Sequence, residues 1–125
     1  MKPGKHGIAR ILNAFKYSFD GFVATFKSEE AFRQDLLVCL VLAPIAIYLP
    51  VGYIDKILML GSLFLILLME LINTGFEVAI DRISDEIHPL SKITKDIGSC
   101  LVLISFLNLT MVWGMILWQN RFIIF

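Results

Sequence analysis

The sequence predicts an all-α membrane protein, with three transmembrane helices and an amphipathic surface helix in a single domain over residues 1–125. Of its 125 residues, 58% are hydrophobic and 18% are charged, whereas soluble domains average about 45–50% and roughly 25%. A soluble domain this small could not bury so much apolar surface. The formal net charge is zero. This composition excludes a disordered chain and gives no basic field for binding nucleic acid.

Three long apolar stretches predict spanning helices over about residues 31–49, 54–81 and 92–119. The third stretch has 22 consecutive residues without a charge, from Ile97 to Trp118, and about 20 apolar residues suffice to cross a bilayer. The first two stretches reach that length only if each helix includes polar residues at one end.

Ahead of the first stretch, apolar residues recur at steps of three and four, which predicts a helix over about residues 6–27. Its apolar face consists of Ile8, Ile11, Leu12, Phe15, Phe19, Phe22, Val23 and Phe26. We expect this helix to lie in the plane of the membrane interface. A plain anchor without chemistry is the alternative.

The basic residues predict the orientation of the chain in the membrane. Nine lysines and arginines lie before Leu36 or between Asp81 and Ile97, against two elsewhere. By the positive-inside rule, the N-terminus and the second loop are cytoplasmic and the C-terminus is on the opposite side. Trp113 and Trp118 are then expected in the outer aromatic belt.

Polar residues inside the second stretch are the strongest sign of function. Glu70, Asn73, Glu77 and Asp81 follow one another at steps of three, four and four residues, which puts them on one face of a helix. Glu70 lies about 10 Å deeper than Glu77 at 1.5 Å per residue. A carboxylate at that depth costs about 2.5 kcal/mol or more, so it is expected to face protein or water.

Further polar residues gather at the same cytoplasmic boundary, from all three stretches: Glu29, Glu30, Arg33, Gln34, Asp35, Lys95, Asp96 and Ser99. An ion-pair cluster that holds the helices together is one interpretation. Carboxylates exceed bases there, however, and hard oxygen ligands suit Mg²⁺ bound together with phosphates. Carboxylates for a metal, a lysine for phosphate and a deeper carboxylate as base are the groups that phosphoryl transfer requires. The pattern therefore favours a kinase that acts on a lipid hydroxyl, although no standard nucleotide-binding motif is present.

The residues themselves resemble a known family. Glu70, Asn73, Glu77 and Asp81 match the E-x-x-N-x-x-x-E-x-x-x-D signature of the prokaryotic diacylglycerol kinases. Several other runs match the same family, and together they extend over nearly the whole chain: Arg10 with Tyr17-Ser18, Glu29 with Ala31-Phe32-Arg33-Gln34, Glu86-Ile87-His88-Pro89-Leu90-Ser91, and Lys95-Asp96-Ile97-Gly98-Ser99.

The resemblance implies a kinase of the bacterial inner membrane that works as a homotrimer with active sites at subunit boundaries. Its members transfer the γ-phosphoryl group of ATP to diacylglycerol and form phosphatidate, which supports phospholipid recycling. Two other functions remain open. Gram-positive relatives prefer undecaprenol, and a small proton-coupled transporter or an anchor subunit would also carry an acid inside a span. A transporter would need polar groups at both faces, whereas this chain has nearly all of them at one.

Matched position by position, the resemblance implies that Glu70 is the general base for the lipid hydroxyl. Asn73 is implied to position the reacting groups, and an interhelical hydrogen bond is its alternative role. Glu29 and Glu77 are implied to hold Mg²⁺ on the ATP phosphates. Asp81 has no settled role, because an ion pair or a helix end explains it equally well.

The remaining roles come from the same resemblance. Lys95 is implied to neutralise phosphate charge, with Asp96 orienting it or contacting the nucleotide. The residues implied to bind nucleotide are Arg10, Tyr17, Glu29, Glu77, Glu86, His88, Lys95 and Asp96. The residues implied to bind the lipid are Arg10, Ser18, Ala31, Arg33, Gln34, Asp35, Glu70, Ser99 and Trp113. A turn at the next proline is the alternative role of His88, and interfacial anchoring is that of Trp113.

Overall fold

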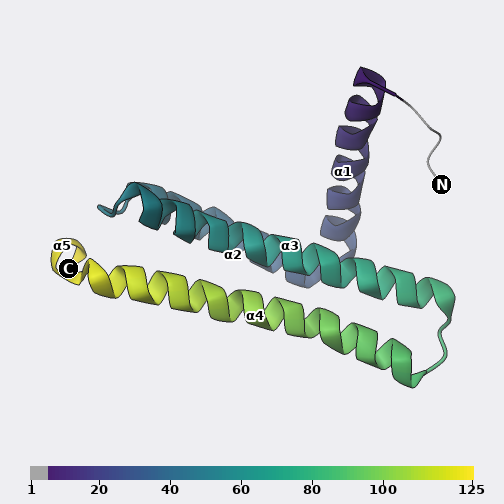
Figure 1. Cartoon of the computed structure of the whole chain (residues 1–125). Coiled ribbons are helices and arrows are strands. Elements are labelled where there is room, and N and C mark those ends of the chain that lie inside the picture. The colour runs from purple at the N-terminus through teal and green to yellow at the C-terminus, as the bar shows by residue number, and fades with distance from the viewer. Residues whose placement is uncertain (1–5) are drawn as a thin grey trace.

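A computed structural model of the chain describes residues 6–125, and those residues form helices joined by short turns, without a strand. Figure 1 shows long helices side by side, with the N-terminal helix standing away from them. The helices are α1 (Ile8–Ser28), α2 (Glu30–Tyr48), α3 (Tyr53–Ile83), α4 (Pro89–Gln119) and the short α5 (Arg121–Ile124). The most extensive packing joins α3 to α4, and α2 packs on α3.

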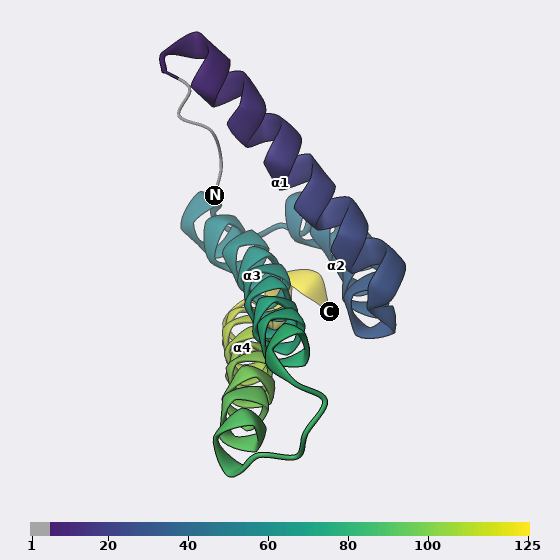
Figure 2. The ribbon, with the colours of Figure 1, turned by 90° about the vertical axis from the view of Figure 1, so that its right-hand side faces the viewer.

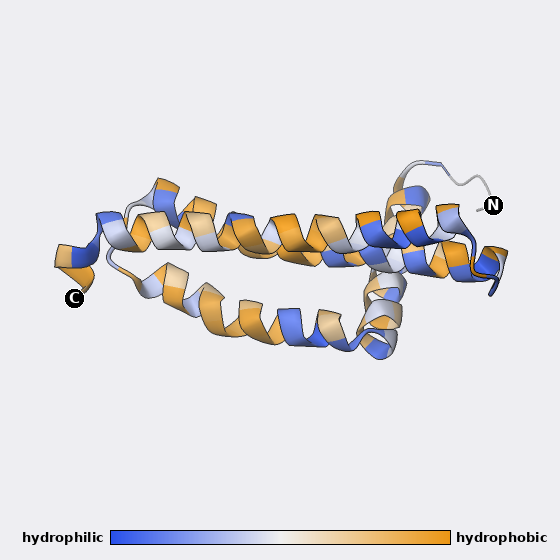
Figure 3. Ribbon diagram, turned by 90° about the horizontal axis from the view of Figure 1, so that it is seen from below, coloured by the Kyte–Doolittle hydropathy of each residue, from blue (hydrophilic) through white to orange (hydrophobic). Residues whose placement is uncertain are grey.

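The helices α2, α3 and α4 are each long and apolar enough to cross a membrane. Apolar residues dominate the middle of all three, and hydrophilic residues concentrate towards the end of the bundle that carries α1 and the α3–α4 turn (Figure 3). This confirms the prediction of an all-helical protein with three membrane-spanning helices. The chain is a multi-pass membrane protein.

The start of α4 is set by local chemistry at its first turn. His88 is the N-cap residue, and its Nδ1 accepts a hydrogen bond of 3.1 Å from the backbone N–H of Leu90. Pro89 follows at the first helical position, where a missing N–H costs nothing. The helix therefore begins three residues before the expected position 92, and His88 has the turn role that we listed as an alternative.

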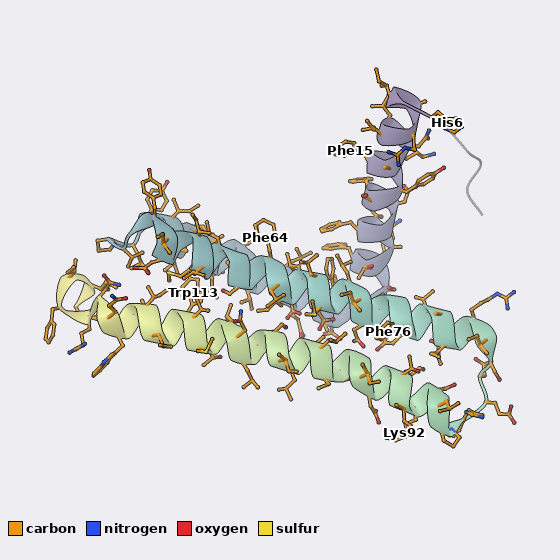
Figure 4. All side chains as sticks on the ribbon, viewed as in Figure 1. His6, Phe15, Phe64, Phe76, Lys92 and Trp113 are labelled. Atoms are coloured by element: carbon orange, nitrogen blue, oxygen red, sulfur yellow. The ribbon has the colours of Figure 1, made fainter. Side chains whose placement is uncertain are left out.

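The best-packed core lies in the half of the bundle away from the α3–α4 turn. It is formed by Ala46, Met59, Leu63, Trp113 and Ile116 from α2, α3 and α4. The indole of Trp113 is 8% exposed, and its Nε1 donates hydrogen bonds to Ser62 Oγ at 3.1 Å and to the Met59 carbonyl at 3.3 Å. Figure 4 shows Trp113 between α3 and α4, whereas Phe64 points away from α4.

This placement differs from the expectation that Trp113 belongs to an aromatic belt. The expectation rested on the position of Trp113 along the sequence. In the structure its face of α4 packs against α3, where a carbonyl and a hydroxyl accept hydrogen bonds from its N–H. Trp118 is 69% exposed.

The helix α1 is joined to α2 through Glu29, whose φ of −113° and ψ of 109° interrupt the helix. Two contacts fix the junction. The Phe22 and Phe32 rings pack edge to face, with their centroids 5.3 Å apart. Arg33 Nη1 donates hydrogen bonds to the carbonyls of Phe26 at 2.6 Å and Lys27 at 3.2 Å. A cation on the last carbonyls of a helix is favourable. Figures 1 and 2 show the rest of α1 extending away from the bundle.

Most of α1 therefore leaves its apolar residues uncovered in a single subunit. The exposed side chains are Ile8, Ile11, Leu12, Phe15, Phe19, Phe22 and Phe26. Large apolar residues are also exposed along α2, α3 and α4, as expected for helices surrounded by lipid or by other helices.

Candidate active site

The face of α3 that carries the predicted site packs against the other helices near Glu70 and becomes exposed near Asp81. Glu70 is buried, at 5% exposed, and Thr74 one turn later is 6% exposed. Asn73 and Glu77 are half-buried, and Asp81 is exposed. The four predicted residues thus form a line from the interior of the bundle to its polar end, as their spacing predicts.

Asp35 of α2 lies against Glu70 in the interior. Asp35 is 8% exposed, and the two carboxyl groups are close enough to interact directly. Oδ2 of Asp35 is buried and has no hydrogen-bond partner among the described residues. Buried polar atoms without a partner are rare in folded proteins, so this pair is a place where a ligand donor would be accommodated.

Glu29 and Glu77 also come together. The carboxylate of Glu77 is near enough to those of Glu29 and Asp81 and to the ammonium group of Lys95 for the charges to interact, and the side-chain amide of Asn73 is also close to it. Among residues 6–125, no three His, Cys, Asp or Glu side chains are arranged to hold a metal ion. Two carboxylates close enough for their charges to interact nevertheless fit Mg²⁺, which commonly binds one or two carboxylates together with substrate phosphates.

Lys95 of α4 forms an ion pair with a residue at the polar end of α3. Its Nζ lies 2.8 Å from Oδ1 of Asp81, which gives Asp81 the ion-pair role that we listed as an alternative. Asp96 forms a 2.5 Å pair with Lys92 on the same helix. Both pairs are substantially exposed, so water or a ligand can compete with them at little energetic cost.

A hollow of about 320 Å³ lies at the α3–α4 turn, bordered by both ion pairs. It brings together five of the residues in question: Asp81, Glu86, His88, Lys95 and Asp96. It combines ammonium groups, carboxylates and an imidazole in an exposed setting at the polar end of the bundle. Such a mixture is suited to a charged, soluble ligand that arrives from the aqueous side.

Other predicted residues are not part of this hollow. Arg10 and Ser18 border a separate small groove on α1, and Tyr17 belongs to that same helix. Arg33 is engaged with the end of α1. Ala31, Gln34 and Ser99 are exposed on α2 and α4, whereas Trp113 lies in the core cluster of the other half.

Two features of the site were missed in the sequence. A groove of about 750 Å³ runs between α1 and α3 and is lined mainly by small and apolar residues, with Arg82 on its border. Gly98 of α4 contacts Asn73. A sequence shows glycines on both helices, but which of them meets a polar residue depends on how the helices pack.

Comparison with known proteins points to a single family. The family model for prokaryotic diacylglycerol kinase matches residues 16–117. The chain is 44% identical to the diacylglycerol kinase of Pseudomonas aeruginosa over 114 residues, which cover 91% of this chain and 93% of that protein. It is 37% identical to the Escherichia coli K12 enzyme over the same shares. It is 39% identical to that of Haemophilus influenzae, over 89% and 94%. This chain belongs to the prokaryotic diacylglycerol kinase family.

Proposed function

We propose that the chain transfers the γ-phosphoryl group of ATP to the hydroxyl of diacylglycerol, giving phosphatidate and ADP. The observation that carries this proposal is the line of polar side chains on α3, which joins a buried carboxyl group, Glu70, to a charged hollow at the polar end. A hydroxyl on an apolar tail arrives from the membrane, and a nucleotide arrives from water. The line is where the two meet.

In the reaction, Glu70 accepts the proton of the lipid hydroxyl while the hydroxyl oxygen forms a bond to the γ-phosphorus. The bond from that phosphorus to the bridging oxygen of ADP breaks, and ADP leaves. Lys95 leaves its ion pair with Asp81 and pairs with the phosphates instead, which neutralises part of their negative charge. Asp96, which pairs with Lys92, borders the nucleotide in the hollow.

Glu29 and Glu77 would hold Mg²⁺, which supplies charge neutralisation on the ATP phosphates when it is bound. The chain's own contribution is to keep the two carboxylates near each other. The side-chain amide of Asn73 lies beside Glu77, and the junction between α1 and α2 places Glu29.

The complete site requires more than one subunit in this proposal. Arg10 and Tyr17 are proposed to bind nucleotide, yet they lie on α1, outside the hollow. A homotrimer that packs α1 of one subunit near α3 and α4 of another would bring them in, and it would also cover part of the exposed apolar surface. We place Arg33, Gln34, Ala31 and Ser99 beside the lipid head group.

We further propose that the protein resides in the bacterial inner membrane as one kinase domain over residues 1–125. Its N-terminus and second loop are cytoplasmic and its C-terminus is periplasmic, as the basic residues predict. The helix α1 lies in the cytoplasmic interface, where its exposed phenylalanines meet the acyl chains.

The test is phosphoryl transfer from labelled Mg-ATP in mixed micelles that contain diacylglycerol and undecaprenol at equal concentration. We expect faster labelling of diacylglycerol. Faster labelling of undecaprenol would replace the proposed substrate but keep the site. If a folded, oligomeric preparation labelled neither lipid, the proposed function would be wrong.

A further inference from the structure

A glycine on α4 lies directly against the asparagine of the α3 site. A Cβ placed on Gly98 would stand 2.1 Å from Oδ1 of Asn73, 3.1 Å from its Cγ and 3.4 Å from its Cα. No Cβ atom tolerates the first of these distances, and Gly98 is buried. A side chain at residue 98 would therefore displace the carboxamide of Asn73, whereas the distance of 3.4 Å to the Asn73 Cα is an ordinary contact.

The two ends of the Asn73 carboxamide have different surroundings. Its amide nitrogen is close enough to the Glu77 carboxylate to interact with it, whereas Oδ1 is buried and has no hydrogen-bond partner among the described residues. In glycine, a hydrogen takes the direction of the missing Cβ, so a Cα–H of Gly98 lies beside Oδ1. Cα–H···O contacts of this kind recur where helices pack closely.

We propose that Gly98 is a positioning residue for the phosphoryl transfer: it fixes the carboxamide of Asn73 so that the nitrogen faces Glu77. The space at Gly98 admits the oxygen, and the Cα–H is the weak donor that keeps it there. Glu77 is thereby restrained in the direction that the proposed metal site needs. The inference rests on the proposed kinase function, because Glu77 has a catalytic purpose only there.

The contact is specific to this glycine. On the same helix, a Cβ at Gly114 would meet nothing within 4 Å, and the same is true of Gly75 on α3. If the helices needed small residues all along their interface, a Cβ at several of these glycines would clash with a neighbour. Among the glycines in residues 6–125, Gly98 alone is placed against a side chain of the predicted site.

The test compares Gly98→Ala with Gly114→Ala, which adds the same methyl group to the same helix. For Gly98→Ala we expect kcat to fall on the order of a hundredfold, because displacements of about 1 Å have that effect in preorganised sites. The Mg²⁺ concentration for half-maximal activity should rise as well. Gly114→Ala should change neither quantity. Equal activity of the two variants would overturn the proposal.

A double-mutant cycle with Asn73→Ala separates positioning from general packing. If Gly98 acts through Asn73, adding Gly98→Ala to Asn73→Ala should lower kcat by less than about twofold further. Additive losses would overturn the proposal. If Gly98→Ala alone fails to fold, the double variant is tested for folding: recovery supports the proposed contact, and failure overturns it.

Melting temperatures in micelles test this inference separately from the proposed function. They are measured for the wild-type protein, the two single variants at Gly98 and Asn73, and the double variant. Gly98→Ala should lower the melting temperature in the wild-type background and not in the Asn73→Ala background. If the wild-type protein labelled no lipid, the kinase proposal would fail, and this thermal cycle would still decide whether Gly98 positions Asn73.

Discussion

At the scale of single residues, the role of Glu77 follows from the charged and polar groups around it. Its charge interacts with those of Glu29, Asp81 and Lys95, and the side-chain amide of Asn73 lies close to it. Replacing Glu77 with Gln keeps its shape but removes a charged ligand. We expect the Mg²⁺ concentration for half-maximal activity to rise by on the order of tenfold or more. The measurement is a Mg²⁺ titration of lipid phosphorylation at saturating ATP and diacylglycerol.

Glu30→Gln is the matched control, because Glu30 is an exposed acid beside Glu29 and is not assigned to the site. It should leave the Mg²⁺ titration unchanged. An unaltered titration in Glu77→Gln would return Glu77 to a structural part.

Residue spacing predicted the α3 line but not its environment. Steps of three and four are sufficient to put Glu70, Asn73 and Glu77 on one helix face. What lies opposite that face depends on the packing of α2 and α4, so neither the contact between Asp35 and Glu70 nor that between Gly98 and Asn73 could be found in the sequence. The roles that we transferred by resemblance remain predictions.

At the scale of helices, the junction of α1 and α2 depends on Arg33. Its guanidinium donates to the carbonyls of Phe26 and Lys27, which end α1. Arg33→Ala should free the end of α1 and increase amide hydrogen exchange along its last two turns. Lys27→Ala removes an exposed cation from the same turn and should have a smaller effect. Equal exchange in the two variants would show that Arg33 does not hold this junction.

The packing of α4 on α3 depends on Trp113 in the other half of the bundle. Trp113→Phe keeps most of the ring but removes the Nε1 donor to Ser62 and Met59. We expect a loss of about 0.5–1.5 kcal/mol in the free energy of unfolding, measured by denaturation in micelles. Trp118→Phe, at an exposed position of the same helix, is the control. Equal stability of both variants would contradict the core role of Trp113.

The sequence predicted the helices better than it predicted their ends and faces. Hydropathy and length were enough for three spanning helices, because a bilayer demands long apolar segments. The start of α4 was placed too late because it depends on a cap formed by His88 and Pro89. Trp113 was assigned to the wrong surroundings because the part of α4 around it carries no charge on any side, and periodicity then gives no inward face.

At the scale of the whole molecule, the proposed trimer predicts complementation between two inactive variants. Arg10→Ala removes a nucleotide residue on α1, and Glu70→Gln removes the base on α3. If each site combines α1 of one subunit with α3 of another, equal mixtures of unfolded subunits that refold together should recover about a quarter of the wild-type activity, since random assembly gives each interface that chance of being intact.

Sites contained within one subunit would recover no activity in this experiment, because every subunit carries one defect. That outcome would contradict the shared site. Mixtures of each variant with itself provide the baseline, and chemical cross-linking of the refolded protein reports the number of subunits.

The central claim is that Glu70 is the base for the lipid hydroxyl. The most direct measurement is the turnover of Glu70→Gln with diacylglycerol, taken together with its affinity for Mg-ATP. We predict that turnover falls by on the order of a hundredfold or more, as the loss of a general base requires, while the affinity for Mg-ATP changes little because Glu70 lies deeper than the nucleotide. Turnover near that of the wild-type protein would contradict the claim.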